Sequence, residues 1–146
     1  MKGPNGEDLP DAVLFACTYN AVRSPMAAAI MRHLYGKHSY VESAGVKAGE
    51  LDPLAVEVLE EIGIDIHNHK PKTFAELEDS SFDLIVSLSP EAHHKALEFT
   101  RVMAVDAEYW PTMDPTAHEG SRDQRLEAYR SVRDTLMKKL KTRFTT

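Results

Sequence analysis

The residues best suited to chemistry are one cysteine and one arginine six positions apart, in the stretch Ala16-Cys17-Thr-Tyr-Asn-Ala-Val-Arg23-Ser24-Pro25. A cysteine thiolate is a strong nucleophile, and a guanidinium can bind two oxygens of one oxyanion. The Ser24 hydroxyl can donate to the Cys17 sulfur and improve it as a later leaving group. These residue types at this spacing predict nucleophilic attack on a phosphate-like oxyanion. The alternative interpretation is a buried, inert core cysteine at a strand end.

The segments on either side of this loop predict how it is held. Ala12–Ala16 is apolar and predicts a buried strand. Ser24–Tyr35 predicts a helix with Ser24 as its N-cap and Pro25 in its first position, and Gly36 ends it. Backbone N–H groups between a strand and a helix can form an anion nest, whose field favours a thiolate. The predicted oxyanion-binding residues are Thr18, Tyr19, Asn20, Ala21, Val22, Arg23 and Ser24.

Short apolar runs alternate with amphipathic segments along the rest of the chain. Further strands are predicted at Ser39–Ser43, Phe82–Leu88 and Arg101–Val105. Further helices are predicted at Asp52–Gly63, after a Thr73/Glu76 capping box, after Ser89-Pro90 and after a Ser121/Gln124 capping pair. This alternation predicts a single α/β domain whose four-stranded, parallel, twisted sheet has helices on both faces. Ligands of such sheets bind beyond the carboxyl ends of the strands, where the Cys17 loop follows the first strand. The irregular stretch Asp106–Gly120 is the second candidate to line that site.

Composition limits the class of protein. The chain has 146 residues, a formal net charge of −6 and one cysteine. The length fits one domain, and we expect residues 1–10 to be a mobile leader and residues 11–146 the folded domain. The negative charge argues against nucleic acid or an anionic membrane as a partner. No signal peptide or apolar span is apparent, so a cytoplasmic location is expected. A single cysteine allows no intrachain disulfide.

The Cys17 loop resembles that of the low-molecular-weight protein tyrosine phosphatases and the thioredoxin-coupled arsenate reductases, which share one fold. The resemblance rests on Cys17, Asn20, Arg23 and Ser24, and it extends over nearly the whole chain. Other similar segments are Ser43-Ala44-Gly45, Glu60–Asp65, Phe82–Val86, Tyr109-Trp110, Asp114-Pro115 and Arg130–Asp134. The C-terminal segments resemble the arsenate reductase branch more than the phosphatase branch.

The resemblance implies roles for single residues. Cys17 would be the nucleophile and Arg23 the oxyanion clamp, while Asn20 would fix the loop conformation. Asp114, in the position of the family's Asp-Pro, would protonate the leaving oxygen and then accept a proton from the attacking water. Pro115 forces Asp114 into an extended conformation. The alternative for Asp114-Pro115 is an ordinary turn.

Three departures from the family pattern alter the expected function. Tyr19 replaces a glycine of the loop, where a left-handed backbone would be costly for tyrosine. No further cysteine exists to relay oxidation, and Ser87-Leu88-Ser89 lies where the first such cysteine is expected. Thr116 follows Asp114-Pro115 where phosphatases of the family carry aromatic residues, so Tyr19, Tyr109 or Trp110 would have to form the wall of a phosphotyrosine pocket.

We expect no metal and no cofactor. His67 and His69, and the pair His93-His94, lack a companion ligand at suitable spacing, and we interpret them as solvated surface histidines.

Three functions remain open. The first is a phosphatase-like hydrolase of phosphate monoesters, including phosphotyrosine, with a cysteinyl-phosphate intermediate. The second is an arsenate reductase that takes electrons from an external thiol such as glutathione, mycothiol or a glutaredoxin. The third is a non-catalytic module that binds an oxyanion or a phosphorylated partner, for which Tyr19 is the main argument.

Overall fold

A parallel four-stranded sheet lies at the centre of the protein. The computed structural model describes residues 9–77 and 81–144. The strands are β1 (Ala12–Cys17), β2 (Tyr40–Gly45), β3 (Leu84–Ser87) and β4 (Asp106–Tyr109). Their order across the sheet is β2-β1-β3-β4, and all neighbouring strands are parallel. The Cys17 loop therefore leaves a central strand, at the edge of the sheet where such folds bind ligands.

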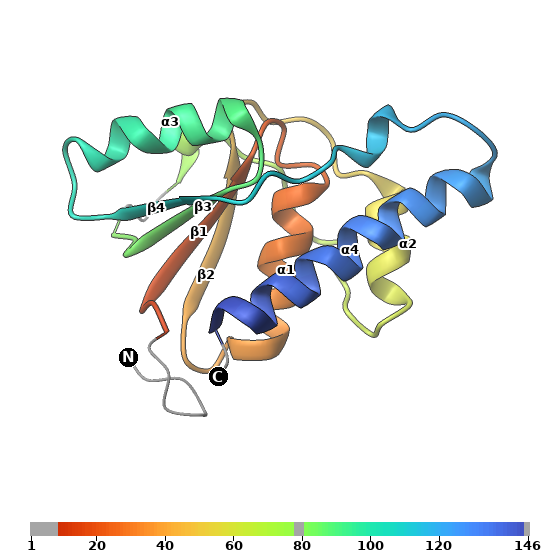
Figure 1. The fold of residues 1–146 in the computed structure, drawn as a ribbon, viewed down its shortest axis with the longest axis horizontal. Helices are drawn as coiled ribbons and strands as arrows, with labels where there is room; N and C mark the ends of the chain where they lie inside the picture. The colour runs from red at the N-terminus through yellow and green to blue at the C-terminus, as the bar shows by residue number, and fades with distance from the viewer. Residues whose placement is uncertain (1–8, 78–80, 145–146) are drawn as a thin grey trace.

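Helices cover both faces of the sheet, as the sequence predicts (Figure 1). On one face α1 (Arg23–Tyr35) packs beside α4 (Arg122–Phe144), and α2 (Pro53–Glu60) extends this layer against α4. On the other face lie α3 (Pro90–Thr100) and the short helix η1 (Phe74–Glu76), whose buried side chains join a second core cluster. The predicted α/β architecture with helices on both faces is confirmed.

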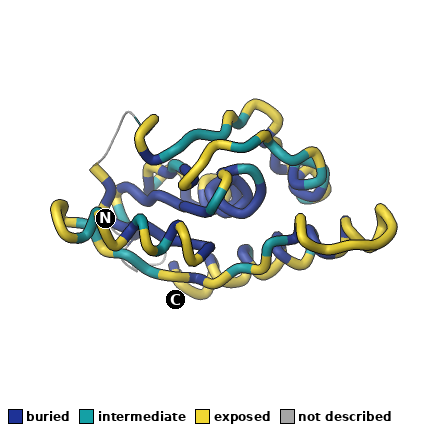
Figure 2. The backbone as a smooth tube through the Cα atoms, turned by 90° about the horizontal axis from the view of Figure 1, so that it is seen from above, coloured by how far each residue is buried: buried dark blue, intermediate teal, exposed yellow. Residues whose placement is uncertain are grey.

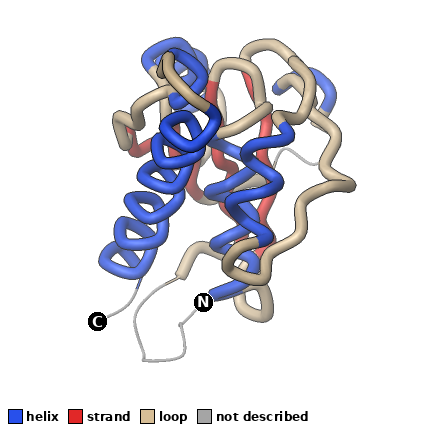
Figure 3. Tube along the Cα trace, turned by 90° about the vertical axis from the view of Figure 1, so that its right-hand side faces the viewer, coloured by secondary structure: helices blue, strands red, loops and turns tan. Residues whose placement is uncertain are grey.

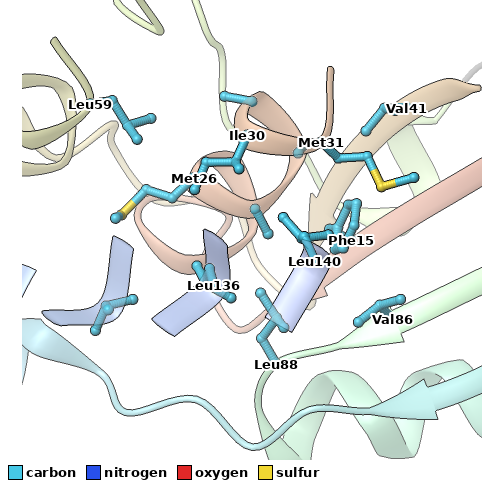
Figure 4. Packing of buried hydrophobic residues seen from close by; sticks show 14 of the residues in the cluster. Phe15, Met26, Ile30, Met31, Val41, Leu59, Val86, Leu88, Leu136 and Leu140 are labelled. Carbon is cyan, nitrogen blue, oxygen red and sulfur yellow. The ribbon is translucent and has the colours of Figure 1, made fainter. Parts of the chain in front are cut away.

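The larger core lies between the sheet and the α1/α4 layer (Figure 4). Phe15 from β1, Ile30 from α1 and Leu140 from α4 are each fully buried there. Burial of one such side chain contributes about 1.5–3 kcal/mol. Seen from above, the buried stretches lie in the interior and the exposed ones along the outside (Figure 2). This core fixes α1, and with it the end of the loop that contains Arg23.

The predicted helix starts at Asp52, Thr73, Ser89 and Ser121 are confirmed. The Asp52 carboxylate accepts a hydrogen bond from the Leu54 N–H (2.9 Å), and the Ser89 hydroxyl accepts one from the Ala92 N–H (3.3 Å). Thr73 with Glu76, and Ser121 with Gln124, form reciprocal capping pairs. These starts were predictable because each involves residues two or three positions apart.

The prediction of a strand at Arg101–Val105 is wrong, because the fourth strand is Asp106–Tyr109. The N–H groups of Val102 and Met103 both donate to the Phe99 carbonyl, so the chain is still turning out of α3 in the predicted segment. Val102 is 77% exposed. The observed strand lies at the sheet edge and is only partly buried, so it carries no run of apolar residues.

The prediction that Ser24 caps α1 is also wrong. The helix begins at Arg23, its N-cap is Val22, and no side chain caps it. The Ser24 hydroxyl bonds within the Cys17 loop instead, as described below. Gly36 does end this helix, as predicted.

Residues 1–8 of the predicted leader lie outside the described residues, and Leu9 packs into the larger core. Across residues 9–77 and 81–144, no helix is both long and apolar enough to cross a membrane.

Candidate active site

The Cys17 loop lies at the carboxyl end of the sheet, among the loops at the upper end of the molecule in Figure 3. Its backbone carbonyls from Cys17 to Ala21 all accept hydrogen bonds from other segments of the chain. The carbonyls of Cys17, Thr18, Tyr19 and Ala21 accept hydrogen bonds from N–H groups of the segment between β2 and α2, at 2.8–3.2 Å. The Asn20 carbonyl accepts from His69 Nε2 at 3.2 Å.

The backbone N–H groups of the loop are unpaired. Within the described part of the chain, no N–H from Thr18 to Arg23 donates a hydrogen bond. Buried N–H groups require an acceptor, yet Asn20 and Val22 are buried and Arg23 is only 9% exposed. With the carbonyls already bonded, these donors at the N-terminus of α1 are available to an anion, as a nest requires. The predicted oxyanion cradle therefore has the hydrogen-bonding pattern that an anion requires.

Cys17 is in contact with Ser24. The Cys17 Sγ lies 2.9 Å from the Ser24 Oγ, and both residues are buried. The Ser24 hydroxyl is thus placed to donate to a Cys17 thiolate, which is the role predicted for it.

Asn20 is the central hydrogen-bonding residue of the loop. It is fully buried, and its φ of +54° is the single positive φ among the described non-glycine residues. Asparagine tolerates this left-handed conformation better than most residues. Its Nδ2 donates to Ser24 Oγ (2.8 Å) and Ser43 Oγ (3.0 Å). Its Oδ1 accepts from Lys72 N (3.0 Å) and His69 Nε2 (3.1 Å). Asn20 therefore joins the loop to β2 and to the segment before η1.

Arg23 connects the Cys17 loop to the segment that carries Asp114. Its Nη1 donates to the Thr112 carbonyl at 3.0 Å, and the Thr112 N–H donates to the Leu88 carbonyl at 3.2 Å. The guanidinium is thereby oriented, while its remaining N–H groups stay available for an oxyanion. The loop before α4 lies beside Arg23, as predicted from the fold class.

Asp114 has the predicted extended backbone, with φ −85° and ψ 108°. One carboxylate oxygen, Oδ1, accepts from the Thr116 N–H (3.0 Å) and the Thr116 hydroxyl (2.7 Å). The other oxygen, Oδ2, bonds to no described residue. Asp114 therefore stabilises a turn, as in the alternative interpretation, and still has one oxygen free for proton transfer.

Tyr19 does not carry the backbone strain that the sequence predicts for it. Its φ is negative, because the left-handed residue of the loop is Asn20. Its side chain is 51% exposed. The close approach occurs instead at Gly45, where a Cβ would lie 2.7 Å from Asn20 N and 2.9 Å from the Thr18 carbonyl oxygen. Tyrosine is accommodated at position 19 because its φ lies outside the left-handed region.

Ser89, the N-cap of α3, and Glu91 in its first turn extend the site and were missed from the sequence. The Thr18 hydroxyl donates to Ser89 Oγ at 3.1 Å and lies 3.4 Å from Glu91 Oε1. Ser43 and Lys72 were missed in the same way as partners of Asn20. The sequence signals were the resemblance of Ser43-Ala44-Gly45 to the family and the place of Ser43 and Ser89 at or just after the carboxyl ends of predicted strands.

The prediction of solvated surface histidines is wrong for His69 and His93. His69 is half-buried and bonded to Asn20, and His93 is half-buried with its ring stacked on Tyr109 at 4.8 Å. Burial lowers the pKa of His69, and the charges of Lys72 and Arg32 lower that pKa further, against the hydrogen bond to Asn20. His67 and His94 are exposed. No cluster of three metal-ligating side chains occurs in residues 9–77 and 81–144.

Comparisons with known proteins identify the family of the chain. The family model described as "Low molecular weight phosphotyrosine protein phosphatase" matches residues 12–146. An arsenate reductase of Bacillus subtilis is 32% identical over 129 residues, 88% of this chain and 91% of that protein. A low molecular weight protein tyrosine phosphatase from T. tengcongensis has a similar structure (TM-score 0.72, 30% identity, 88% and 94% coverage). So does the YwlE arginine phosphatase of Geobacillus stearothermophilus (TM-score 0.69, 26% identity, 90% and 88% coverage). The chain belongs to the low molecular weight phosphotyrosine protein phosphatase family.

Proposed function

We propose that this protein hydrolyses phosphate monoesters through a cysteinyl-phosphate intermediate. The observation that carries the proposal is the run of unpaired N–H groups from Thr18 to Arg23, in the loop that begins at Cys17 and holds its contact with Ser24 at 2.9 Å. A buried nest of this kind fits a tetrahedral oxyanion whose central atom faces the Cys17 sulfur.

The reaction has two displacement steps. In the first, the Cys17 thiolate forms a bond to phosphorus, the P–O ester bond breaks, and Asp114 in its acid form protonates the departing oxygen. In the second, Asp114 accepts a proton from water, the water oxygen bonds to phosphorus, and the S–P bond breaks. Ser24 stabilises the sulfur as it leaves. Inorganic phosphate is released and Cys17 returns to its starting state.

Arg23 and the loop backbone supply the positive charge for both steps. The phosphoryl group carries its charge on its non-bridging oxygens in the transition state, and fixed donors stabilise it without reorganisation. The Thr112 carbonyl holds Arg23 in place before substrate arrives, which lowers the entropy cost of forming the complex.

The test is turnover of p-nitrophenyl phosphate. Cys17→Ala should abolish turnover, and Asp114→Asn should lower kcat by about 100-fold, the usual worth of a general acid. Asp106→Asn is the matched control, because Asp106 is an exposed carboxylate at the amino end of β4. Full turnover by the Cys17→Ala variant would overturn the proposal.

The substrate class is open between phosphotyrosine and other phosphorylated groups. Tyr19, which is 51% exposed beside the loop, can stack on an aromatic leaving group. Phosphotyrosine and phosphoarginine peptides of the same sequence should therefore be compared, since YwlE is an arginine phosphatase. We propose that the reaction takes place in the cytoplasm, where reductants keep a thiol such as Cys17 reduced.

The second candidate is an arsenate reductase with an external thiol, which the Bacillus subtilis relative favours. Cys17 would bond to arsenic with loss of water. A thiol would then attack the Cys17 sulfur, so that arsenic(V) leaves as arsenite and a mixed disulfide remains. A second thiol would release Cys17 as a thiolate and form the external disulfide. The electrons must come from outside, because the chain has one cysteine.

Arsenate-dependent oxidation of glutathione, mycothiol or a glutaredoxin separates this candidate from the first. Thiol oxidation without aryl phosphate turnover would identify a reductase. Tight phosphate binding with neither reaction would identify the third candidate, a binding module.

A further inference from the structure

A cavity lined by basic residues lies between α1 and the segment that follows α2, and it reaches the Cys17 loop through His69. Its volume is about 600 Å³, and along α1 its lining extends from Pro25 in the first turn to Arg32 and His33 near the end. Its basic lining residues are Arg32, His33, His67, His69, Lys70 and Lys72. This clustering is notable in a chain whose formal net charge is −6.

The positive charge of the cavity is only partly neutralised. Asp65 is the one acidic lining residue, and its carboxylate is already bonded to the ring of His67 (2.6 Å). Glu42, next to the cavity, is shared by Lys72 (3.2 Å) and Arg32 (3.6 Å).

Two basic residues are left without partners. Neither Lys70 nor His33 makes an ion pair or a hydrogen bond with any residue in the described ranges. The cavity therefore contains hydrogen-bond donors, on Lys70 and His33, that are not paired with a carboxylate of these ranges.

The volume indicates a ligand larger than a single ion. Binding cavities for small molecules typically measure about 300–1,000 Å³, and one phosphate fills a small part of that. Several cations spread over one cavity match several linked anionic groups. We propose that this cavity binds a small molecule with several phosphate groups, and that His69 links its occupancy to the Cys17 loop.

The link follows from the hydrogen bonds of His69. Its Nε2 lies near two acceptors, the Asn20 carbonyl oxygen and Asn20 Oδ1, so Nε2 carries the hydrogen. In the neutral ring Nδ1 is then without a proton. A polyanion in the cavity favours a proton on Nδ1, and the charged ring bonds Asn20 more strongly. Occupancy should therefore hold the loop around Cys17 more rigidly.

Other charges also act on His69. Lys72 and Arg32 oppose its protonation, Glu42 favours it, and Asp65, His67, Lys70 and His33 line the same cavity. An added polyanion shifts this balance toward the protonated ring.

The probes are tripolyphosphate and ATP, with binding measured by calorimetry. Lys70→Glu should weaken binding by about tenfold or more, because it replaces a charge-assisted contact with repulsion. Lys138→Glu, the same reversal on the exposed surface of α4, is the matched control and should have little effect. His33→Glu serves as a second cavity variant should Lys70→Glu fail to fold. A Kd for ATP equal to or lower than the Kd for tripolyphosphate supports the site. The difference between the two Kd values gives the contribution of the nucleoside.

Binding that Lys70→Glu and His33→Glu leave unchanged would place the probe in the Cys17 loop and overturn the proposal. Absence of binding by either probe would also overturn it. For the link, alkylation by iodoacetamide reports on Cys17 alone. Tripolyphosphate should slow the alkylation of Cys17 in the wild type and in Lys138→Glu. In Lys70→Glu and His69→Gln, the alkylation rate should be the same with and without tripolyphosphate. The link would be refuted if tripolyphosphate binds to the wild type and the rate of Cys17 alkylation stays the same.

Discussion

Replacement of Asn20 by alanine should be the most damaging single change to the site outside Cys17 and Arg23. Asn20 is fully buried and makes four side-chain hydrogen bonds of 2.8–3.1 Å. At about 1 kcal/mol each, their loss costs about 4 kcal/mol. Alanine at φ +54° adds about 1 kcal/mol of strain. With partial relaxation of the loop, the free energy of unfolding should fall by about 3–5 kcal/mol, a large part of the 5–15 kcal/mol usual for a domain.

The assay is urea unfolding, followed by fluorescence of the single tryptophan, Trp110, which is buried. Asn20→Gly loses the same hydrogen bonds but accepts the backbone conformation, so it should be about 1 kcal/mol more stable than Asn20→Ala. Asn68→Ala is the matched control, because Asn68 is exposed, and its effect should stay within about 0.5 kcal/mol. A loss below about 1 kcal/mol for Asn20→Ala would refute the view that this network holds the loop.

Three further outcomes are expected. Ser24→Ala should lower kcat for aryl phosphate hydrolysis by about tenfold or more, because it removes one hydrogen bond to the charged Cys17 sulfur. Pre-steady-state kinetics should show that the S–P bond breaks more slowly. An unchanged kcat would contradict this prediction. The pKa of His69 in the folded state lies below its ordinary value of 6.5. The contribution of His69 to the free energy of unfolding is therefore full above pH 6.5, and it is lost as the pH falls through the folded-state pKa. Urea unfolding at about pH 7.5 and about pH 5.5 should therefore show a smaller acid loss for His69→Gln than for the wild type, and equal losses would count against it. Tyr129→Phe removes the hydroxyl that donates to Asp52, at the N-cap of α2, and should cost about 1 kcal/mol of stability by the same assay; no change would show that water replaces the bond.

Local signals in the sequence determined the fold class and the chemistry of the loop. Asp52 before Pro53, and Ser121 with Gln124, fix helix starts through contacts two or three residues apart. The apolar stripe of α4, which runs from Leu126 to Leu140 at helical spacing, is buried. Cys17, Arg23 and Ser24 were recognisable because one loop holds them. The fourth strand was placed wrongly because an edge strand lacks the apolar run that marks a buried one.

The tertiary structure alone decided what surrounds that loop. His69 lies 49 residues from Asn20, and Thr112 lies 89 residues from Arg23, yet each makes a direct hydrogen bond. Such contacts depend on where the crossover connections return the chain to the edge of the sheet, and no short pattern encodes that position. The same holds for Gly45, whose missing side chain lets the end of β2 approach the Asn20 backbone. Residue types and spacing identified which residues could react with an oxyanion. Long-range packing established which residues hold them in place, because those partners meet only once the sheet has formed.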